Sequence, residues 1–207
     1  MKYITLTTFI LGFLLFGCYQ TKSKTTSVSD DKGQIQNLIR QVLNWSNSKN
    51  KIDLLPVLTD IKDSVYIGFS LEKHKENLVK LRETDLFTTE FIENYNQIIL
   101  TLDKKLRDKE FEEWRVGELP TFNFANDADP WTLWQDVPND NPNPWDLVEV
   151  KVIKLDKDKG ELTWTWEKSE LSNEFGYKFR VKRENGKWKI AYMQGFDFKE
   201  STRKDGL

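Results

Sequence analysis

The hydrophobic periodicity of this chain changes once along its length, from the spacing of helices to the alternation of strands. From about residue 148 onward, apolar side chains occupy every second position in four short segments, and Leu162, Trp164 and Trp166 form the clearest of them. Period-two alternation predicts strands with one buried and one solvent-facing side. Turn residues separate the segments, and Asn185-Gly186 is the strongest hairpin signal among them. The second half therefore predicts a four-stranded antiparallel meander.

The two faces of this predicted sheet differ in chemistry. The inward positions carry Val, Leu, Trp, Phe, Tyr and Ile without an acid, and Tyr177 and Tyr192 supply the only polar tips. The outward positions of the second segment are acidic or hydroxylic, whereas those of the third are basic. Such side chains are complementary when they face one another across an antiparallel pair. We therefore expect a packed inner face and a solvated outer face.

The first half of the chain has helical spacing. Apolar residues at positions 35–43 recur every three or four residues and predict a first helix. Ser70 is placed to cap a second helix from Leu71 to Arg82. A third and longer helix is expected after Thr84 and Asp85. It has the cleanest amphipathic stripe in the chain, made of Phe91, Tyr95, Ile98, Ile99, Leu102 and Leu106.

Two short segments are harder to assign. Residues 52–58 contain Pro56 and predict at most a short helix that begins near the proline. Residues 65–69 are β-branched and fit either a strand or part of a helix. Helices followed by an antiparallel sheet, packed as two layers, define an α+β domain. We place this single domain at 33–200 and a polar tail at 201–207.

The N-terminus has the features of a secretory signal. Lys2 precedes the apolar run 3–16, and Gly17 and Cys18 follow it. The run is shorter than the roughly 20 apolar residues of a membrane span. We therefore predict a signal peptide at 1–17 and a polar tether at 18–32. Alternatives are an ordinary secretory signal with an incidental cysteine, or an uncleaved anchor.

The string at 15–18, Leu-Phe-Gly-Cys, resembles the lipobox of bacterial lipoproteins. In that family the cysteine becomes the acylated first residue of the mature chain. The resemblance implies that Cys18 carries acyl chains such as palmitate, and that the membrane is a partner through this lipid. It places the protein in the cell envelope. Cys18 is the only cysteine, so the folded part has none to form a disulfide.

Composition excludes several kinds of chemistry. The formal net charge is −2, with basic and acidic residues interleaved, so no nucleic-acid partner is expected. One histidine and one cysteine are too few for a zinc site, and no glycine-rich phosphate loop suggests a cofactor. His74 shares a helix face with Leu71 and Leu78, which favours a packing role over general base catalysis.

The order of elements resembles the cone-shaped fold of the nuclear transport factor 2 superfamily. Residues 186–190 (GKWKI) resemble the last-strand signature of that superfamily. Residues 87–97 (FTTEFIENYNQ) and the acidic, Trp-rich loop after Pro120 resemble a family of uncharacterised bacterial lipoproteins assigned to this fold. The resemblance implies a curled sheet that wraps a long helix around a pocket, and it carries no established activity.

The irregular segment 117–146 is the main candidate for function. A loop of this length inside a compact domain is usually functional or disordered, and its tryptophans argue against disorder. It contains Trp131, Trp134 and Trp145 together with Asp127, Asp129 and Asp136. These residues suggest a ligand platform for sugars or cations, or a calcium loop of the three aspartates. Alternatively, the tryptophans only close the open end of the sheet.

The sequence thus favours a non-enzymatic, membrane-tethered domain that binds a small ligand or an envelope protein. No catalytic residue can be assigned. The alternative is an isomerase- or hydrolase-like enzyme with a carboxylate and a tyrosine in the cone pocket, such as Glu90 or Glu93 with Tyr95 on the long helix.

Overall fold

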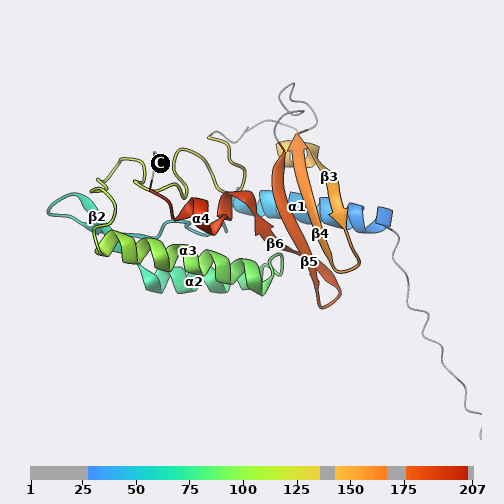
Figure 1. Cartoon of the computed structure of the whole chain (residues 1–207), viewed down its shortest axis with the longest axis horizontal. Helices are drawn as coiled ribbons and strands as arrows, with labels where there is room; N and C mark the ends of the chain where they lie inside the picture. Colours follow the sequence, from blue (N-terminus) through green and yellow to red (C-terminus); the bar gives the residue numbers. More distant parts are fainter. Residues whose placement is uncertain (1–27, 136–142, 167–175, 205–207) are drawn as a thin grey trace, which may run out of the picture.

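The computed structural model describes residues 28–135, 143–166 and 176–204 of the chain (Figure 1). It is an α+β structure with a four-stranded antiparallel sheet, as the sequence predicted. In chain order the elements are α1 (Val28–Ser46), β1 (Val57–Asp60), β2 (Val65–Phe69), α2 (Leu71–Glu83), α3 (Thr89–Arg107), η1 (Pro144–Leu147), β3 (Val148–Leu155), β4 (Lys159–Trp166), β5 (Tyr177–Glu184), β6 (Lys187–Met193), η3 (Gln194–Phe196) and α4 (Phe198–Ser201).

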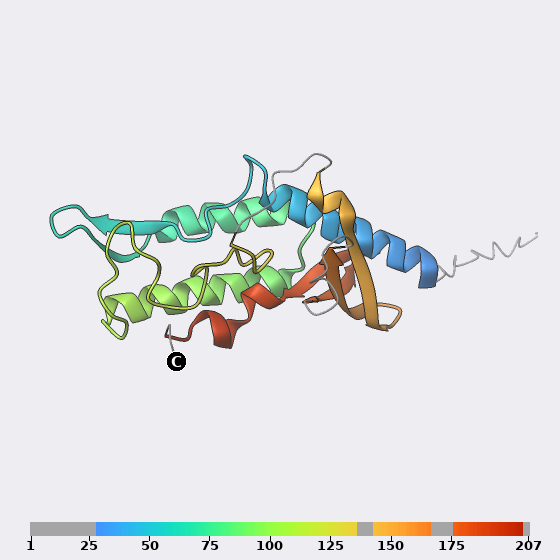
Figure 2. The same cartoon turned by 90° about the horizontal axis from the view of Figure 1, so that it is seen from above.

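The molecule is elongated. Figure 2 shows the β1–β2 hairpin at one end and the four-stranded sheet at the other, with α2 and α3 running between them. Helix α1 crosses the inner face of the sheet and packs on β3 and β6, while α3 packs on β6 and β2. The N-terminal end of α1 lies at the sheet end of the molecule (Figure 2).

The predicted cap of the second helix is confirmed. The Ser70 side chain accepts a hydrogen bond from the Lys73 main chain and caps α2, and Thr88 caps α3 in the same way through Phe91. Such caps satisfy main-chain N–H groups that have no partner within the helix. Helix α1 begins at Val28, inside the segment expected to be tether, because the buried Asp31 on its first turns binds the sheet.

The sheet has the predicted order β3-β4-β5-β6. The acidic and basic outer positions face one another as expected, since Glu161 pairs with Arg180 across β4 and β5. The turn between β5 and β6 has positive φ at both Asn185 (53°) and Gly186 (78°). Two successive positive φ values define the type I′ turn, whose twist matches that of a hairpin.

The expectation of a curled sheet, which came from the resemblance to the cone-shaped family, was wrong: the sheet is not curled. The cone-shaped fold is not confirmed. A sheet wraps a helix when the helix lies along its concave face. Here α1 crosses and covers the inner face, while the long helix α3 contacts the sheet mainly at β6 and continues past it to β2 (Figure 1).

Two local predictions were wrong. Residues 52–58 do not start a helix, because Val57–Asp60 pairs with Val65–Phe69 as a hairpin. Tyr192 does not point inward. The register shifts between Arg180 and Val181, so that Arg180 faces Tyr192 while Val181 faces Ile190. This bulge places Tyr192 on the outer face, where the Arg180 guanidinium lies 4.6 Å from its ring.

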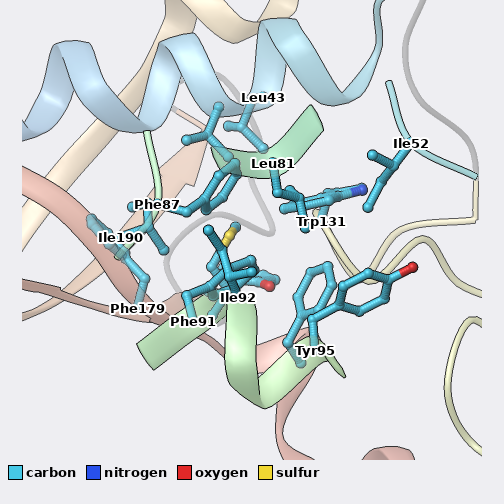
Figure 3. Close-up of a cluster of buried hydrophobic side chains, with 14 of the residues drawn as sticks. Leu43, Ile52, Leu81, Phe87, Phe91, Ile92, Tyr95, Trp131, Phe179 and Ile190 are labelled. Atoms are coloured by element: carbon cyan, nitrogen blue, oxygen red, sulfur yellow. The ribbon is translucent and has the colours of Figure 1, made fainter. Parts of the chain in front are cut away.

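The core contains an aromatic cluster centred on Trp131 (Figure 3). The centroid of the Trp131 ring lies 4.5 Å from that of Phe196. It also lies within about 6 Å of the ring centroids of Trp45, Phe87 and Phe91. These rings come from α1, from α3 and its approach, from the 117–135 segment and from η3. Burial of so many large side chains is the main stabilisation of the domain.

Candidate ligand groove at Asp129 and Trp131

The described part of the irregular segment has its own compact hydrogen bonding. The main-chain N–H of Asp129 donates to Trp134 O (3.0 Å), and Leu133 N donates to Asp129 O (2.7 Å). The Asp129 side chain accepts from Trp131 N at 2.8 Å. Aspartate commonly stabilises turns through bonds of this kind to its own downstream main chain. The segment is therefore an ordered turn that fixes the position of Trp131.

Tyr177 attaches this turn to the sheet. Its hydroxyl donates to Pro130 O at 2.7 Å and accepts from Gly195 N at 2.9 Å. Full burial raises the pKa of Tyr177 well above its usual value, so the hydroxyl stays protonated. The inward tyrosine of β5 thus links the sheet, the loop and the start of η3.

Trp131 presents an edge to the surface rather than a face. Only 1% of the residue is exposed, and aromatic rings pack around it. Figure 3 shows its indole nitrogen directed toward Ile52. A sugar or a cation therefore has no access to the ring faces of Trp131 in this structure, whereas the indole N–H points at a groove.

The groove lies between the end of α1, the residues after it and the Asp129 turn. It has a volume of about 420 Å³. Its lining residues are Ser46, Lys51, Ile52, Asp53, Leu54, Asp129 and Trp131. Ile52 is buried, while Lys51 and Asp53 are exposed at the rim. The arrangement combines an apolar wall with one half-buried carboxylate.

Burial raises the pKa of Asp129 above its ordinary value. Two smaller influences lower it: the hydrogen bond from Trp131 N and the positive charge of Lys51. A carboxylate that loses solvation in this way gains from a partner that donates hydrogen bonds or carries positive charge. Among the candidate residues in the sequence, Asp129 and Trp131 are brought together for this role.

The other candidate residues have different surroundings. Asp127 is exposed and accepts from Gln135 Nε2 at 2.5 Å. Trp134 is half-buried in the same turn. Trp145 is 2% exposed in η1, which packs on α1, so its side chain is part of the core. Asp136 and Cys18 lie outside the described residues.

No metal cluster is seen in residues 28–135, 143–166 and 176–204, where no three His, Cys, Asp or Glu side chains gather closely enough for an ion. The third ligand of the calcium hypothesis, Asp136, lies outside those ranges. Within the same ranges, no helix is long and apolar enough to cross a membrane.

The residues considered for catalysis have structural partners. Tyr95 is buried and donates to Leu54 O at 3.1 Å, and burial raises its pKa. Glu90 pairs with Lys182, and Glu93 accepts from Gln97 Nε2. His74 is 2% exposed and bonds Asn96, which confirms the packing interpretation.

Sequence reasoning missed five of the seven residues that line the groove. Lys51, Ile52 and Leu54 follow α1 in a stretch without a motif, and only tertiary packing brings them opposite the Asp129 turn. Comparison of the chain with protein-family models, curated proteins and solved structures gave no match. The groove must therefore be interpreted from its own chemistry.

Proposed function

We propose that the chain is a bacterial lipoprotein, acylated at Cys18 and held at the cell envelope, whose domain binds a small ligand at Asp129 without transforming it. One observation carries the binding part of the proposal. A half-buried carboxylate and an indole N–H edge converge on a groove with an apolar wall. Small-molecule sites typically combine an apolar lining with a few fixed polar groups in this way.

The groove suits a ligand with an amino or hydroxyl group beside an apolar body. Asp129 keeps acceptor capacity beyond its bond from Trp131 N, because a carboxylate offers about four lone-pair positions. Ile52 and Leu54 supply apolar contact, and the indole N–H of Trp131 offers a donor. Because the ring faces of Trp131 are covered, we propose edge-on hydrogen bonding in place of ring stacking.

Asp129→Asn tests the groove. The amide oxygen keeps the bond from Trp131 N but removes the charge, so the turn is preserved while affinity for amines falls at least tenfold. Asp127→Asn is the matched control, because Asp127 is exposed and lies two residues away. Tryptophan emission is followed while amines, amino sugars and neutral sugars are added. Equal affinity of the Asp129→Asn variant and the unaltered chain would reject the site.

Cys18→Ser tests the anchor independently. Acylation at Cys18 predicts that the unaltered chain fractionates with membranes and incorporates labelled palmitate, and that the variant does neither. Stable anchoring needs more than one acyl chain or a second attractive contact. Unchanged labelling of Cys18→Ser would reject acylation while leaving the ligand groove untouched.

An isomerase- or hydrolase-like activity is the alternative function. It would require Asp129 to exchange a proton with the ligand, which its raised pKa favours. Consumption of any compound that binds in the emission assay, abolished by Asp129→Asn, would support this alternative over simple binding.

A further inference from the structure

The outer face of the four-stranded sheet carries a row of three lysines. Lys159 on β4 faces Lys182 on β5, and Lys182 in turn faces Lys189 on β6. Like charges directly opposite one another on neighbouring strands repel. A row of this kind lowers stability unless an anion lies near it, so each member needs a partner.

Acidic side chains from outside the sheet form ion pairs with two of the three lysines. Lys189 binds Asp85 at 2.5 Å with only 10% of its side chain exposed, and Lys182 pairs with Glu90 of α3. Asp85 also binds Lys187, and the two lysines lower the pKa of Asp85 to about 2. In the part of the chain that the structure describes, Lys159 has no acid within ion-pair distance.

The remaining outer positions extend this positive character. We define the basic sheet face by its outward cations, Lys151, Lys154, Lys159, Lys178, Arg180, Lys182, Lys187 and Lys189. The outward acids on the same strands are Glu149, Glu161 and Glu184. The face remains positive after Asp85 and Glu90 are added, although the whole chain has 31 basic and 33 acidic residues. The excess is therefore local to this face.

The start of α1 lies close to the same end of the sheet. Asp31 pairs with Arg183, the neighbour of Lys182 on β5, and accepts a hydrogen bond from Trp188 Nε1 on β6. Arg183 and Trp188 face the inner side of the sheet, so the chain that precedes Val28 leaves the domain from that side, at the same end of β5 and β6 as the lysine row. The ten residues 18–27 span at most about 35 Å when fully extended.

We propose that the basic sheet face docks on the anionic lipid surface of the membrane that holds the chain. The inference rests on the proposed anchor, which keeps the face within reach of that surface and makes docking intramolecular. Each lysine or arginine near an anionic leaflet contributes about 1 kcal/mol, a factor of about five. Docking turns the outer face of the sheet toward the lipid. The β1–β2 hairpin lies at the opposite end of the molecule from the sheet (Figure 2).

Lysine acetylation on vesicles tests this orientation. The full chain is reconstituted into phosphatidylcholine vesicles, with or without phosphatidylglycerol, and acetylation of each lysine is followed by mass spectrometry. We expect Lys159 and Lys178 to react about fivefold more slowly on anionic vesicles, and the difference to vanish in 1 M salt. Lys73 and Lys75, which are exposed on α2, are internal references and react equally on both. Equal rates at Lys159 and Lys178 on the two vesicles overturn the proposal.

A double charge reversal provides the matched variant. Lys159→Glu with Lys178→Glu should abolish protection of Lys182 on anionic vesicles, whereas Lys73→Glu with Lys75→Glu should leave it intact. Protection that survives the first variant overturns docking through this face. Stronger protection by a short oligonucleotide than by vesicles also overturns it. Failure of the chain to sediment with phosphatidylcholine vesicles would instead count against the anchor.

Discussion

Gly195 lies so close to Pro130 that a Cβ atom on the glycine would fall 2.0 Å from the Pro130 carbonyl oxygen. This contact joins the end of β6 to the turn that holds Trp131. The obstacle is main chain, which cannot rotate away as a side-chain tip can. Only glycine permits the approach, although its φ is not in the left-handed region.

Gly195→Ala should therefore lower the free energy of unfolding by at least about 2 kcal/mol, the range of overpacked cores. Urea unfolding followed by circular dichroism measures the change. Gly33→Ala is the matched control, because nothing lies within 4 Å of its Cβ and it sits inside α1. There alanine should stabilise by about 0.5–1 kcal/mol. Equal urea midpoints for the Gly195→Ala and Gly33→Ala variants would contradict the close approach of Gly195 to Pro130.

Tyr177→Phe should destabilise the same junction. The substitution removes one hydroxyl and leaves both Pro130 O and Gly195 N without their partner. Loss of bonds in a buried setting costs about 1–3 kcal/mol. Tyr192→Phe is a suitable comparison, since that hydroxyl is half-buried and its bond to Asp197 measures 3.3 Å. We expect a much smaller loss of unfolding free energy for Tyr192→Phe. A larger loss at Tyr192 than at Tyr177 would refute the proposed role of the Tyr177 hydroxyl bonds.

The contrast between these tyrosines shows where sequence reasoning succeeded and failed. The alternation of apolar and polar residues correctly predicted that Tyr177 faces inward. The same alternation wrongly predicted that Tyr192 faces inward. The intervening bulge at Ala191 adds one residue to β6 and exchanges the faces beyond it. No residue in the segment signals the bulge, because it depends on the register of the neighbouring strand.

The candidate site was predictable in composition but not in geometry. The tryptophans and aspartates of 117–146 identified the segment, and Asp129 with Trp131 line the groove. Four aromatic rings from other elements decide that Trp131 offers its edge, and those contacts are set by packing between segments far apart in sequence. The Ser70 cap and the Asn185-Gly186 turn were predictable because their causes are local.

The pair between Asp31 and Arg183 provides a third prediction. The two side chains are 10% and 18% exposed, so removing one charge leaves the other poorly solvated. Asp31→Asn should cost about 3 kcal/mol and loosen the first turns of α1. Glu113→Gln is the control, since its pair with Arg115 is over 60% exposed on both sides and should contribute under about 0.5 kcal/mol. Thermal unfolding of both variants separates the cases, and similar small losses would contradict the burial argument.

His74 should make the domain sensitive to mild acid. Its Nε2 lies 3.0 Å from Asn96 Oδ1, an acceptor, so this nitrogen carries the proton of the neutral ring. Nδ1 is buried with no hydrogen-bond partner among the described residues. A second proton would sit there unsatisfied, and burial accordingly lowers the pKa of His74 below 6.5.

Because the unfolded chain binds this proton more readily, stability is complete above pH 6.5 and declines as the pH falls below that value. The decline approaches about 1.4 kcal/mol per pH unit until the ring is also protonated in the folded state. His74→Gln removes the titrating group while keeping a donor toward Asn96. We expect the variant to be less stable at pH 8 but to show a flatter profile between pH 5 and 6.5, measured by urea unfolding. Parallel profiles for the two proteins would assign the acid sensitivity to other groups.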